Sequence, residues 1–286
     1  MVGSRFIDML RGKFSFQAPS QDDLDITKVD DLRSYIDRNI PDLIINFSAF
    51  TNVKESQDQE NDKTGLVYMI NAKAVSDLSD IALKSNIKLI QISTEYVFDG
   101  SKSDSPYTEE DKPNPKNWYG KTKYYGEEFI RMSGCKFLIV RISMPFCASF
   151  NLKKDLVRTF IEKLKNKNEI HAVTDSKITP ISIDDLVYSL EVLINADKSG
   201  IYHIVPPDYT TPYDFVNLIA DEFNLDKSNI FETTFNEYTK EGNKLLLQYS
   251  WLSSKKFREE FETLNLKSIA ESIKILKDHI INPGLT

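Results

Sequence analysis

Cysteine, histidine and long apolar runs are scarce in this chain of 286 residues. Its two cysteines, Cys135 and Cys147, are too few for a disulfide framework and lack a C-x-x-C spacing, which predicts a cytoplasmic protein. The three histidines are scattered without a ligand spacing, so we expect no metal site. Apolar stretches such as Phe137–Val140 are far shorter than the roughly 18–20 residues that cross a bilayer, and the first residues do not resemble a signal peptide, so we expect no membrane partner.

Positive charge is also in short supply. The net charge of −7 argues against a nucleic-acid partner, because proteins that bind the phosphate backbone carry a basic face or stripe. No G-x-S-x-G elbow and no P-loop string occurs, which disfavours hydrolases and NTPases of those kinds. The 41% of hydrophobic and 28% of charged residues are those of an ordinary soluble globular protein.

Apolar runs of strand length recur along the chain, each followed by a segment of helical period. The runs are Leu43–Phe47, Ile87–Ile92 and Phe137–Arg141, and this alternation predicts parallel strands joined by helices. Because the runs are continuously apolar, both faces of the sheet should be covered. The pattern predicts an α/β fold, a Rossmann-like doubly wound parallel sheet with a smaller mixed α/β domain. Helices are predicted at Leu32–Arg38, Gly65–Leu83, Tyr119–Met132 and Ile183–Ile194.

The pattern changes near Gly200, which indicates a second structural unit. We expect a strand, a helix, a strand and a terminal helix there, at Ile201–Val205, Pro212–Phe223, Ile230–Thr234 and Ser268–Ile280. The predicted division is a Rossmann-like dinucleotide-binding domain of residues 1–142 and 172–199, and a substrate-binding domain of residues 143–171 and 200–286.

The chain opens with a helix-like segment, Val2–Leu10, and no strand precedes it. A dinucleotide fold normally begins with a strand and a glycine-rich turn that places the pyrophosphate at a helix N-terminus. Only Gly3 could belong to such a turn, so the first strand and the turn are expected to be missing, through a truncated start. A sheet without its central first strand would leave neighbouring strand edges uncovered.

Tyr119 and Lys123 are the first candidates for chemistry. They follow the turn Pro113–Pro115, so Tyr119 should open a helix, and residues four apart lie on one helical face. The Lys123 ammonium would then lower the pKa of the phenol, ordinarily ~10, toward the range in which it exchanges protons at neutral pH. A Y-x-x-x-K string alone is also compatible with an incidental pair in a helix.

Thr94 and Ser93 stand where the apolar run Ile87–Ile92 ends. Ligands of open α/β sheets bind at the carboxyl ends of the strands, so either hydroxyl could bond to the substrate oxygen that Tyr119 protonates. The alternative for Thr94 is a strand-end hydroxyl that only caps a turn. The presence of Tyr119 and Lys123 favours the catalytic interpretation.

Two strings together resemble the extended short-chain dehydrogenase/reductases, and within them the dTDP-4-dehydrorhamnose reductases. Residues 93–100 read S-T-E-Y-V-F-D-G, similar to the family's S-T-D-Y-V-F-D-G, and residues 114–123 end in Y-G-K-T-K. The resemblance implies that Thr94, Tyr119 and Lys123 are catalytic. It implies hydride transfer from NADPH or NADH to the C4 keto carbon of a nucleotide-linked deoxysugar, with a proton from Tyr119, while the protein orients the substrate and stabilises the alkoxide.

The same resemblance implies the binding residues. The substrate residues would be Thr94, Glu95 and Ser143. Asn71 matches a family position, where it is either functional or a buried asparagine that satisfies backbone groups, and Arg141 would either contact ligand or form a packing salt bridge. The cofactor residues would be Val2, Gly3, Phe47, Ser48, Ala49, Ser93, Tyr119 and Lys123.

Some positions depart from the family pattern and leave alternatives open. Met144 replaces a tryptophan and Ile178 a glycine, which puts the substrate in doubt. The missing turn favours a non-catalytic regulatory subunit similar to the methionine adenosyltransferase β subunit. A sugar-nucleotide epimerase or dehydratase is disfavoured because Tyr96 stands where dehydratases have a second acid. Phe16–Ala18, at the end of a predicted second strand, does not separate NADH from NADPH. A homodimer is possible.

Overall fold

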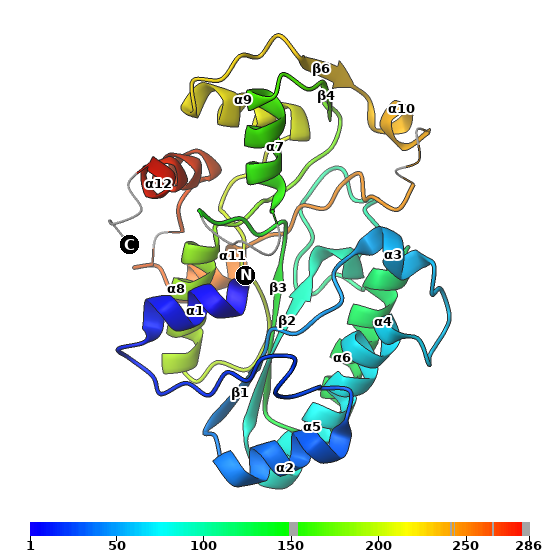
Figure 1. Ribbon diagram of the computed structural model, residues 1–286, viewed down its shortest axis with the longest axis vertical. Coiled ribbons are helices and arrows are strands. Elements are labelled where there is room, and N and C mark those ends of the chain that lie inside the picture. The colour runs from blue at the N-terminus through cyan, green and yellow to red at the C-terminus, as the bar shows by residue number, and fades with distance from the viewer. Residues whose placement is uncertain (149–153, 241, 243, 265, 282–286) are drawn as a thin grey trace.

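The computed structural model describes residues 1–148, 154–240, 242, 244–264 and 266–281 (Figure 1). Its main sheet is parallel and has the order β1-β2-β3-β5. The strands are β1 (Leu43–Asn46), β2 (Lys88–Thr94), β3 (Phe137–Ile142) and β5 (Gly200–His203). Among the described strands β1 pairs with β2 alone, so the other edge of β1 carries no strand.

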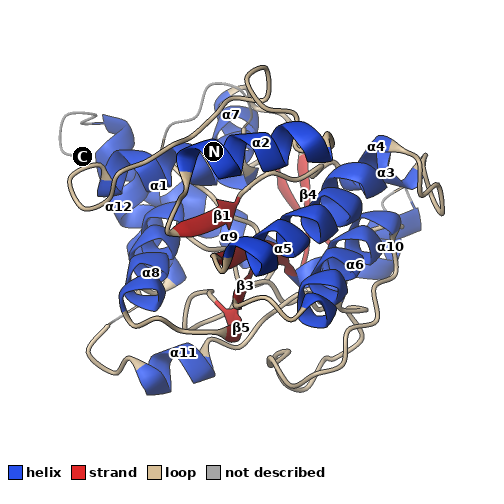
Figure 2. Ribbon diagram, turned by 90° about the horizontal axis from the view of Figure 1, so that it is seen from below, coloured by secondary structure: helices blue, strands red, loops and turns tan. Residues whose placement is uncertain are grey.

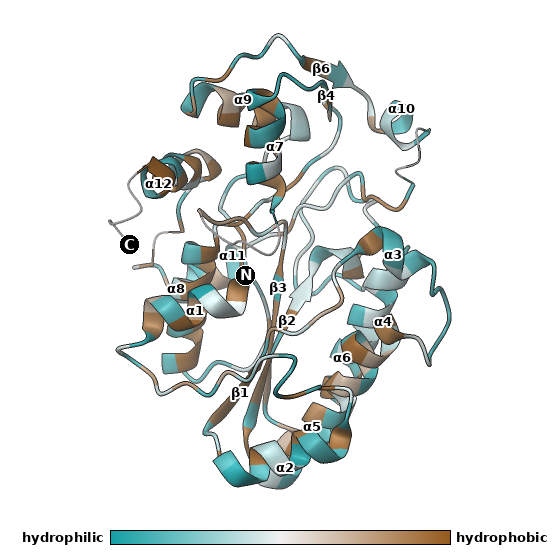
Figure 3. Cartoon of the chain, in the orientation of Figure 1, coloured by the Kyte–Doolittle hydropathy of each residue, from teal (hydrophilic) through white to brown (hydrophobic). Residues whose placement is uncertain are grey.

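Helices cover both faces of this sheet (Figures 1 and 2). Alternate residues of one strand feed two separate cores: Ile90 of β2 packs on one side and Leu89 on the other, both fully buried. This explains the continuous apolarity of the strands, which Figure 3 shows as brown segments of β1 and β2. One layer comprises α1 (Val2–Leu10), α8 (Ile183–Asn195) and α11 (Lys255–Glu260), and the other α2 (Val29–Asn39), α5 (Ala74–Ser85) and α6 (Trp118–Ser133).

A smaller group of elements lies beyond the carboxyl ends of the strands (Figure 1). Two short parallel strands, β4 (Ile170–Val173) and β6 (Ile230–Thr233), pair with each other. These strands pack against Leu164 and Val216 of two neighbouring helices. A second core, with Val157, Phe215 and Ile273, lies between three helices. These helices are α7 (Leu156–Lys165), α9 (Pro212–Glu222) and α12 (Ile269–Ile281), and a short helix, α10 (Phe235–Lys240), follows β6.

Two expectations about strands are wrong. The strand expected near residue 200 does not belong to the smaller domain, because β5 pairs with β3 in the main sheet. Strand pairing is non-local, so an apolar run does not identify its partner. The expected strand ending at Phe16–Ala18 does not form, and those residues are irregular. The expected domain boundary between residues 171 and 172 also falls inside β4. Apart from these two strands, the division into two domains stays a prediction.

The expected helix Gly65–Leu83 forms as three consecutive pieces. They are α4 (Leu66–Tyr68), a π-helical turn (Met69–Lys73) and α5, and Asn71 lies in the middle piece. A further short helix, α3 (Val53–Gln57), precedes them. Single π-turns inside helices are frequent at functional sites, and this one faces α6.

Candidate active site

The carboxyl end of β2 supplies the first part of the site. Thr94 is the last residue of the strand, and a 3₁₀ turn, Glu95–Val97, follows it. The Thr94 hydroxyl accepts a hydrogen bond from the Tyr96 N–H at 3.3 Å and donates one to Glu95 Oε2 at 2.7 Å. The turn-capping role considered for Thr94 is therefore present, and it fixes the hydroxyl at the end of the strand.

Helix α6 supplies the second part, and its first turn is placed tightly. The Asn117 side chain caps the helix by accepting from the Gly120 N–H at 2.8 Å. A Cβ at Gly120 would lie 2.1 Å from the Tyr96 carbonyl oxygen, so only glycine allows α6 to approach the 3₁₀ turn this closely. The approach brings Tyr119 next to the turn, where its ring meets that of Tyr96 edge-on at 5.6 Å.

The structure brings Thr94, Tyr119 and Lys123 together at this edge of the sheet. All three are buried, with exposed fractions of 5%, 8% and 4%. The Tyr119 hydroxyl shares a hydrogen bond with Thr94. The Lys123 ammonium donates to the Ile92 carbonyl of β2 at 2.8 Å. An ammonium has three N–H groups, and this is its one hydrogen bond to the described residues, so two N–H groups are available to a ligand.

The expected downward shift of the Tyr119 pKa is wrong: the pKa is raised, and Lys123 is not among the groups that shift it. Burial, followed by the charge of Glu95, raises the pKa of Tyr119 well above its ordinary value, and only the hydrogen bond with Thr94 opposes this. Burial also lowers the pKa of Lys123 to about 8, against the opposing charge of Glu127. In this buried site the phenol is neutral at physiological pH, which is the form that can donate a proton.

Glu95 lies in the same cluster and connects it to a second strand, β3. Ser143, which follows β3, donates to Glu95 Oε1 at 3.3 Å. Burial raises the pKa of Glu95 to about 7, although hydrogen bonds from Thr94 and Ser143 oppose the shift. The next residue, Met144, has a φ of 42°, a left-handed conformation that is unusual for its side chain. The structure thus places all three predicted substrate residues in one cluster.

The raised pKa of Glu95 predicts a pH-dependent stability. The folded protein keeps a proton that the unfolded chain, with a pKa near 4.5, has lost, so the unfolding free energy should fall as pH rises from about 4.5 to about 7. At about 1.4 kcal/mol per unit of pKa difference, the fall is roughly 3 kcal/mol. Urea unfolding across this range should show that Glu95→Gln removes this decline, whereas Glu110→Gln, at an exposed position, keeps it. Parallel curves for wild type and Glu95→Gln would contradict the assignment.

Five of the eight predicted cofactor residues form a second group at the end of β1, while Ser93, Tyr119 and Lys123 belong to the first cluster. The five are Val2, Gly3, Phe47, Ser48 and Ala49. A Cβ at Gly3 would lie 3.1 Å from the Phe47 ring. Val2 and Phe47 both pack against the hydrophobic core that contains Ile90. The Ser48 N–H donates to Asn46 Oδ1 at 3.0 Å. Ala49 follows directly. Among the described residues no hydrogen bond joins this group directly to Thr94 or Tyr119, which stand at the ends of the neighbouring elements.

The donors present fit a dinucleotide. The first turn of α1 has no side-chain cap, and the first N–H groups of a helix have no intrahelical partner, so they are donors that suit a phosphate. The two available N–H groups of Lys123 suit ribose hydroxyls. The Ser93 hydroxyl does not offer its proton to a cofactor, because it donates to the Glu127 carboxylate at 2.5 Å. Within the described parts of the chain, no group of His, Cys, Asp or Glu is arranged to hold a metal ion.

Three further residues have their roles resolved by contacts. Asn71 accepts from the Phe50 N–H at 2.9 Å and donates to the Phe50 carbonyl and to Thr122. These bonds favour the alternative in which Asn71 is a buried asparagine that satisfies backbone groups. Arg141 is 2% exposed and forms a buried ion pair with Glu127 at 2.6 Å, which favours the salt-bridge alternative. Sequence reasoning missed Glu127, although it lies four residues after Lys123 on the same helical face.

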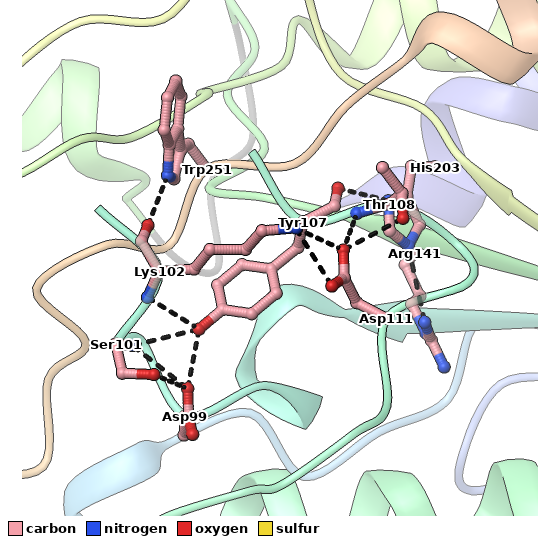
Figure 4. Close-up of polar contacts among 9 residues, drawn as sticks. All are labelled: Asp99, Ser101, Lys102, Tyr107, Thr108, Asp111, Arg141, His203 and Trp251. Carbon is pink, nitrogen blue, oxygen red and sulfur yellow. Dashed lines mark hydrogen bonds and ion pairs between the residues drawn. The ribbon is translucent and has the colours of Figure 1, made fainter. Parts of the chain in front are cut away.

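The loop after the 3₁₀ turn is held by its own polar network (Figure 4). The Tyr107 hydroxyl donates to Asp99 at 2.7 Å and accepts from the Ser101 N–H. Burial would raise the pKa of Asp99, but hydrogen bonds from Tyr107 and Ser101 hold it well below its ordinary value. The Trp251 indole donates to the Lys102 carbonyl at 2.9 Å, which attaches the loop to the C-terminal part of the chain.

A parallel sheet with a strand-end threonine beside a Tyr-x-x-x-Lys helix defines an extended short-chain dehydrogenase/reductase. The family model for the RmlD substrate binding domain matches residues 1–279, and the chain belongs to that family. The family and the fold class predicted from the sequence are thereby confirmed. No helix in the described residues is long and apolar enough to cross a membrane.

Individual relatives agree with this assignment. The dTDP-4-dehydrorhamnose reductase of Aggregatibacter actinomycetemcomitans is 33% identical over 217 residues, which cover 74% of this chain and 71% of that protein. A solved dTDP-4-dehydrorhamnose reductase ortholog from Clostridium acetobutylicum has a TM-score of 0.87 and 29% identity, and covers 98% of this chain and 96% of its own. The enzyme from Bacillus anthracis, solved in complex with NADP, has a TM-score of 0.87 and 26% identity, with coverages of 96% and 94%.

Proposed function

We propose that this protein is a reductase that uses NADPH or NADH to reduce the 4-keto group of a nucleotide-linked deoxysugar, with dTDP-4-dehydrorhamnose as the reference substrate. The observation that carries the proposal is the buried cluster of Thr94, Tyr119 and Lys123 at the carboxyl edge of the sheet. Several of its relatives bear the name of this reductase, and the Bacillus anthracis structure contains NADP.

Each residue has a definable task in this reaction. When bound, the nicotinamide supplies the hydride. Tyr119 and Thr94 would hold the keto oxygen between their hydroxyls, and Tyr119, kept neutral by burial, would protonate the alkoxide that forms. The Lys123 ammonium would hold ribose hydroxyls with its two available N–H groups. Glu95 and Ser143 border the same cluster and would contact the sugar.

The cofactor side is assigned to the ends of β1 and α1. The first turn of α1 would receive the pyrophosphate at its backbone N–H groups, with Gly3 allowing close approach beside Phe47. Val2, Ser48 and Ala49 would line the same region. Because the edge of β1 beside them carries no described strand, the affinity of the chain for a dinucleotide is the critical quantity.

A cofactor titration separates the reductase from a non-catalytic regulatory subunit. NADH and NADPH are added to the full chain while nicotinamide fluorescence is followed, and saturable binding of at least one is expected. Lys123→Met should weaken this binding, and Lys121→Met, two residues away on the exposed side of α6, should not. Failure of both cofactors to bind the wild-type chain would overturn the reductase proposal.

A further inference from the structure

Glu127 is a buried carboxylate for which the mechanism above gives no task. It lies one helical turn after Lys123 on α6 and is 1% exposed. Three donors reach it: Ser93 Oγ at 2.5 Å and Arg141 Nε at 3.0 Å bond to Oε1, and Arg141 Nη2 bonds to Oε2 at 2.6 Å. Both oxygens are therefore occupied by groups from the neighbouring strands β2 and β3.

A buried ion pair of this kind is weak evidence for stability. Removing two charges from water costs several kcal/mol for each ion, and apolar replacements of similar size are often neutral or stabilising. The Glu127–Arg141 pair adjoins the catalytic cluster, because Glu127 is one helical turn from Lys123 and accepts from Ser93, the residue before Thr94. The carboxylate therefore lies where its charge acts on the groups of the cluster.

The neighbour most affected is the Lys123 ammonium. Burial favours its neutral form, and the charge of Glu127 opposes that effect. Because Ser93 and Arg141 occupy the carboxylate, Glu127 acts on Lys123 through its charge, without a hydrogen bond. The ammonium thus keeps two N–H groups for a ligand while remaining within the field of a negative charge.

Among the groups around this pair, Glu95 is the one that titrates near neutral pH, with a pKa of about 7, and it acts on Tyr119. The others have fixed charges or none. On α6, the Tyr119 phenol is neutral, and on β2 the Ile92 carbonyl accepts from Lys123. On β5, burial and the charge of Arg141 lower the pKa of His203 well below its ordinary value, so its ring is neutral beside Arg141.

Arg141 itself is held from two sides. The His203 Nε2 atom lies 3.4 Å from its Nη1, and the guanidinium lies 5.1 Å from the centre of the Phe98 ring. The His203 Nδ1 atom contacts the Tyr107 carbonyl oxygen at 3.2 Å, and the carboxylate of Glu109 accepts from the His203 backbone N–H. These contacts prevent Arg141 from swinging away from Glu127.

We propose that Glu127 is a positioning residue that keeps Lys123 protonated in the working enzyme, and that Arg141 holds the Glu127 carboxylate in place. The inference rests on the proposed role of Lys123 in binding and catalysis. It assigns to the buried pair a function in the electrostatics of the site.

The test is the pH dependence of Glu127→Gln, a substitution that preserves size and an acceptor for Ser93. Lys123 should lose its proton at a pH lower by roughly one unit in the variant. Its activity should fall about fivefold below wild type near pH 8 and approach wild type below about pH 6.5. The titration of Lys123 is also followed directly, through the ¹³Cε shift in protein labelled at lysine and assigned with Lys123→Met.

Asp185→Asn is the matched control. Asp185 is another buried carboxylate, 4% exposed, and it accepts from Lys267 at 2.6 Å and from Ser272 at 3.1 Å on the far layer of helices. Its loss should lower stability without moving the titration of Lys123. If Glu127→Gln does not fold, Glu127→Gln combined with Arg141→Met removes both charges. Lys123 should again titrate below its wild-type value, by less than in Glu127→Gln because the charge of the guanidinium is lost as well.

The outcomes separate this inference from the proposed function. A wild-type chain without reductase activity defeats the proposed function, while the lysine titration still tests the effect of Glu127 on Lys123. A folded Glu127→Gln variant in which Lys123 titrates as in wild type would overturn the inference, even when the chain is an active reductase.

Discussion

Replacing Tyr119 with phenylalanine is expected to lower kcat by roughly 10²–10⁴-fold, the contribution that a positioned proton donor makes to a rate. The reason is chemical, since the substitution removes the hydroxyl that shares a hydrogen bond with Thr94 at the carboxyl edge of the sheet. The ring that packs against Tyr96 is retained. Steady-state assays with a 4-keto sugar nucleotide and NAD(P)H, combined with urea unfolding, should therefore show a large loss of turnover and a small change in the unfolding free energy.

Tyr124→Phe provides the control for this prediction. Tyr124 lies on the same helix, α6, but is partly exposed, and its ring packs near Val97 and Tyr107 on the far side of the turn. Its hydroxyl has no place in the proposed reaction, so kcat should remain close to that of wild type. Undiminished turnover in Tyr119→Phe would show that the proton reaches the substrate from another group.

The second large effect concerns stability. Arg141→Met is expected to lower the unfolding free energy by about 3–5 kcal/mol, because it leaves the Glu127 carboxylate buried without its cationic partner. The methionine has room in the site, since the guanidinium already packs against the Phe98 ring. Urea or thermal unfolding of the purified variant measures the loss.

Two further variants serve as comparisons for Arg141→Met. Combining Arg141→Met with Glu127→Gln removes the stranded charge and should restore much of the lost stability. Arg131→Met breaks an exposed pair with Glu128 on the same helix and should cost less than about 1 kcal/mol. An Arg141→Met protein as stable as Arg131→Met would show that the buried carboxylate is not held as a charge.

The helices could be predicted closely because their signals are local. The expected segment Val2–Leu10 coincides with α1, and Tyr119–Met132 differs from α6 by one residue at each end. Helix α6 begins at an asparagine cap and ends at Gly134 with a positive φ of 81°, both readable from sequence. Strand membership could not be predicted in this way, because β5 is defined by its pairing with a strand about sixty residues earlier.

The site was predictable in its members but less so in its electrostatics. The spacing within α6 and the strand end at Thr94 were sufficient to bring Thr94 and Tyr119 together. The direction of the Tyr119 pKa shift could not be predicted from the sequence. It depends on burial and on the charge of Glu95, which only the packed structure determines. Glu127 was overlooked for the same reason, since its partner Arg141 comes from a different element of the fold.

The most direct measurement is the transfer of deuterium from nicotinamide to sugar. The full chain is incubated with dTDP-4-dehydrorhamnose and NADPH or NADH deuterated at the transferring position of the nicotinamide, and the product is examined by NMR and mass spectrometry. One deuterium at C4 of the sugar, together with a new hydroxyl there, is the predicted result. Recovery of unreduced sugar nucleotide, or of label at another carbon, would contradict the account.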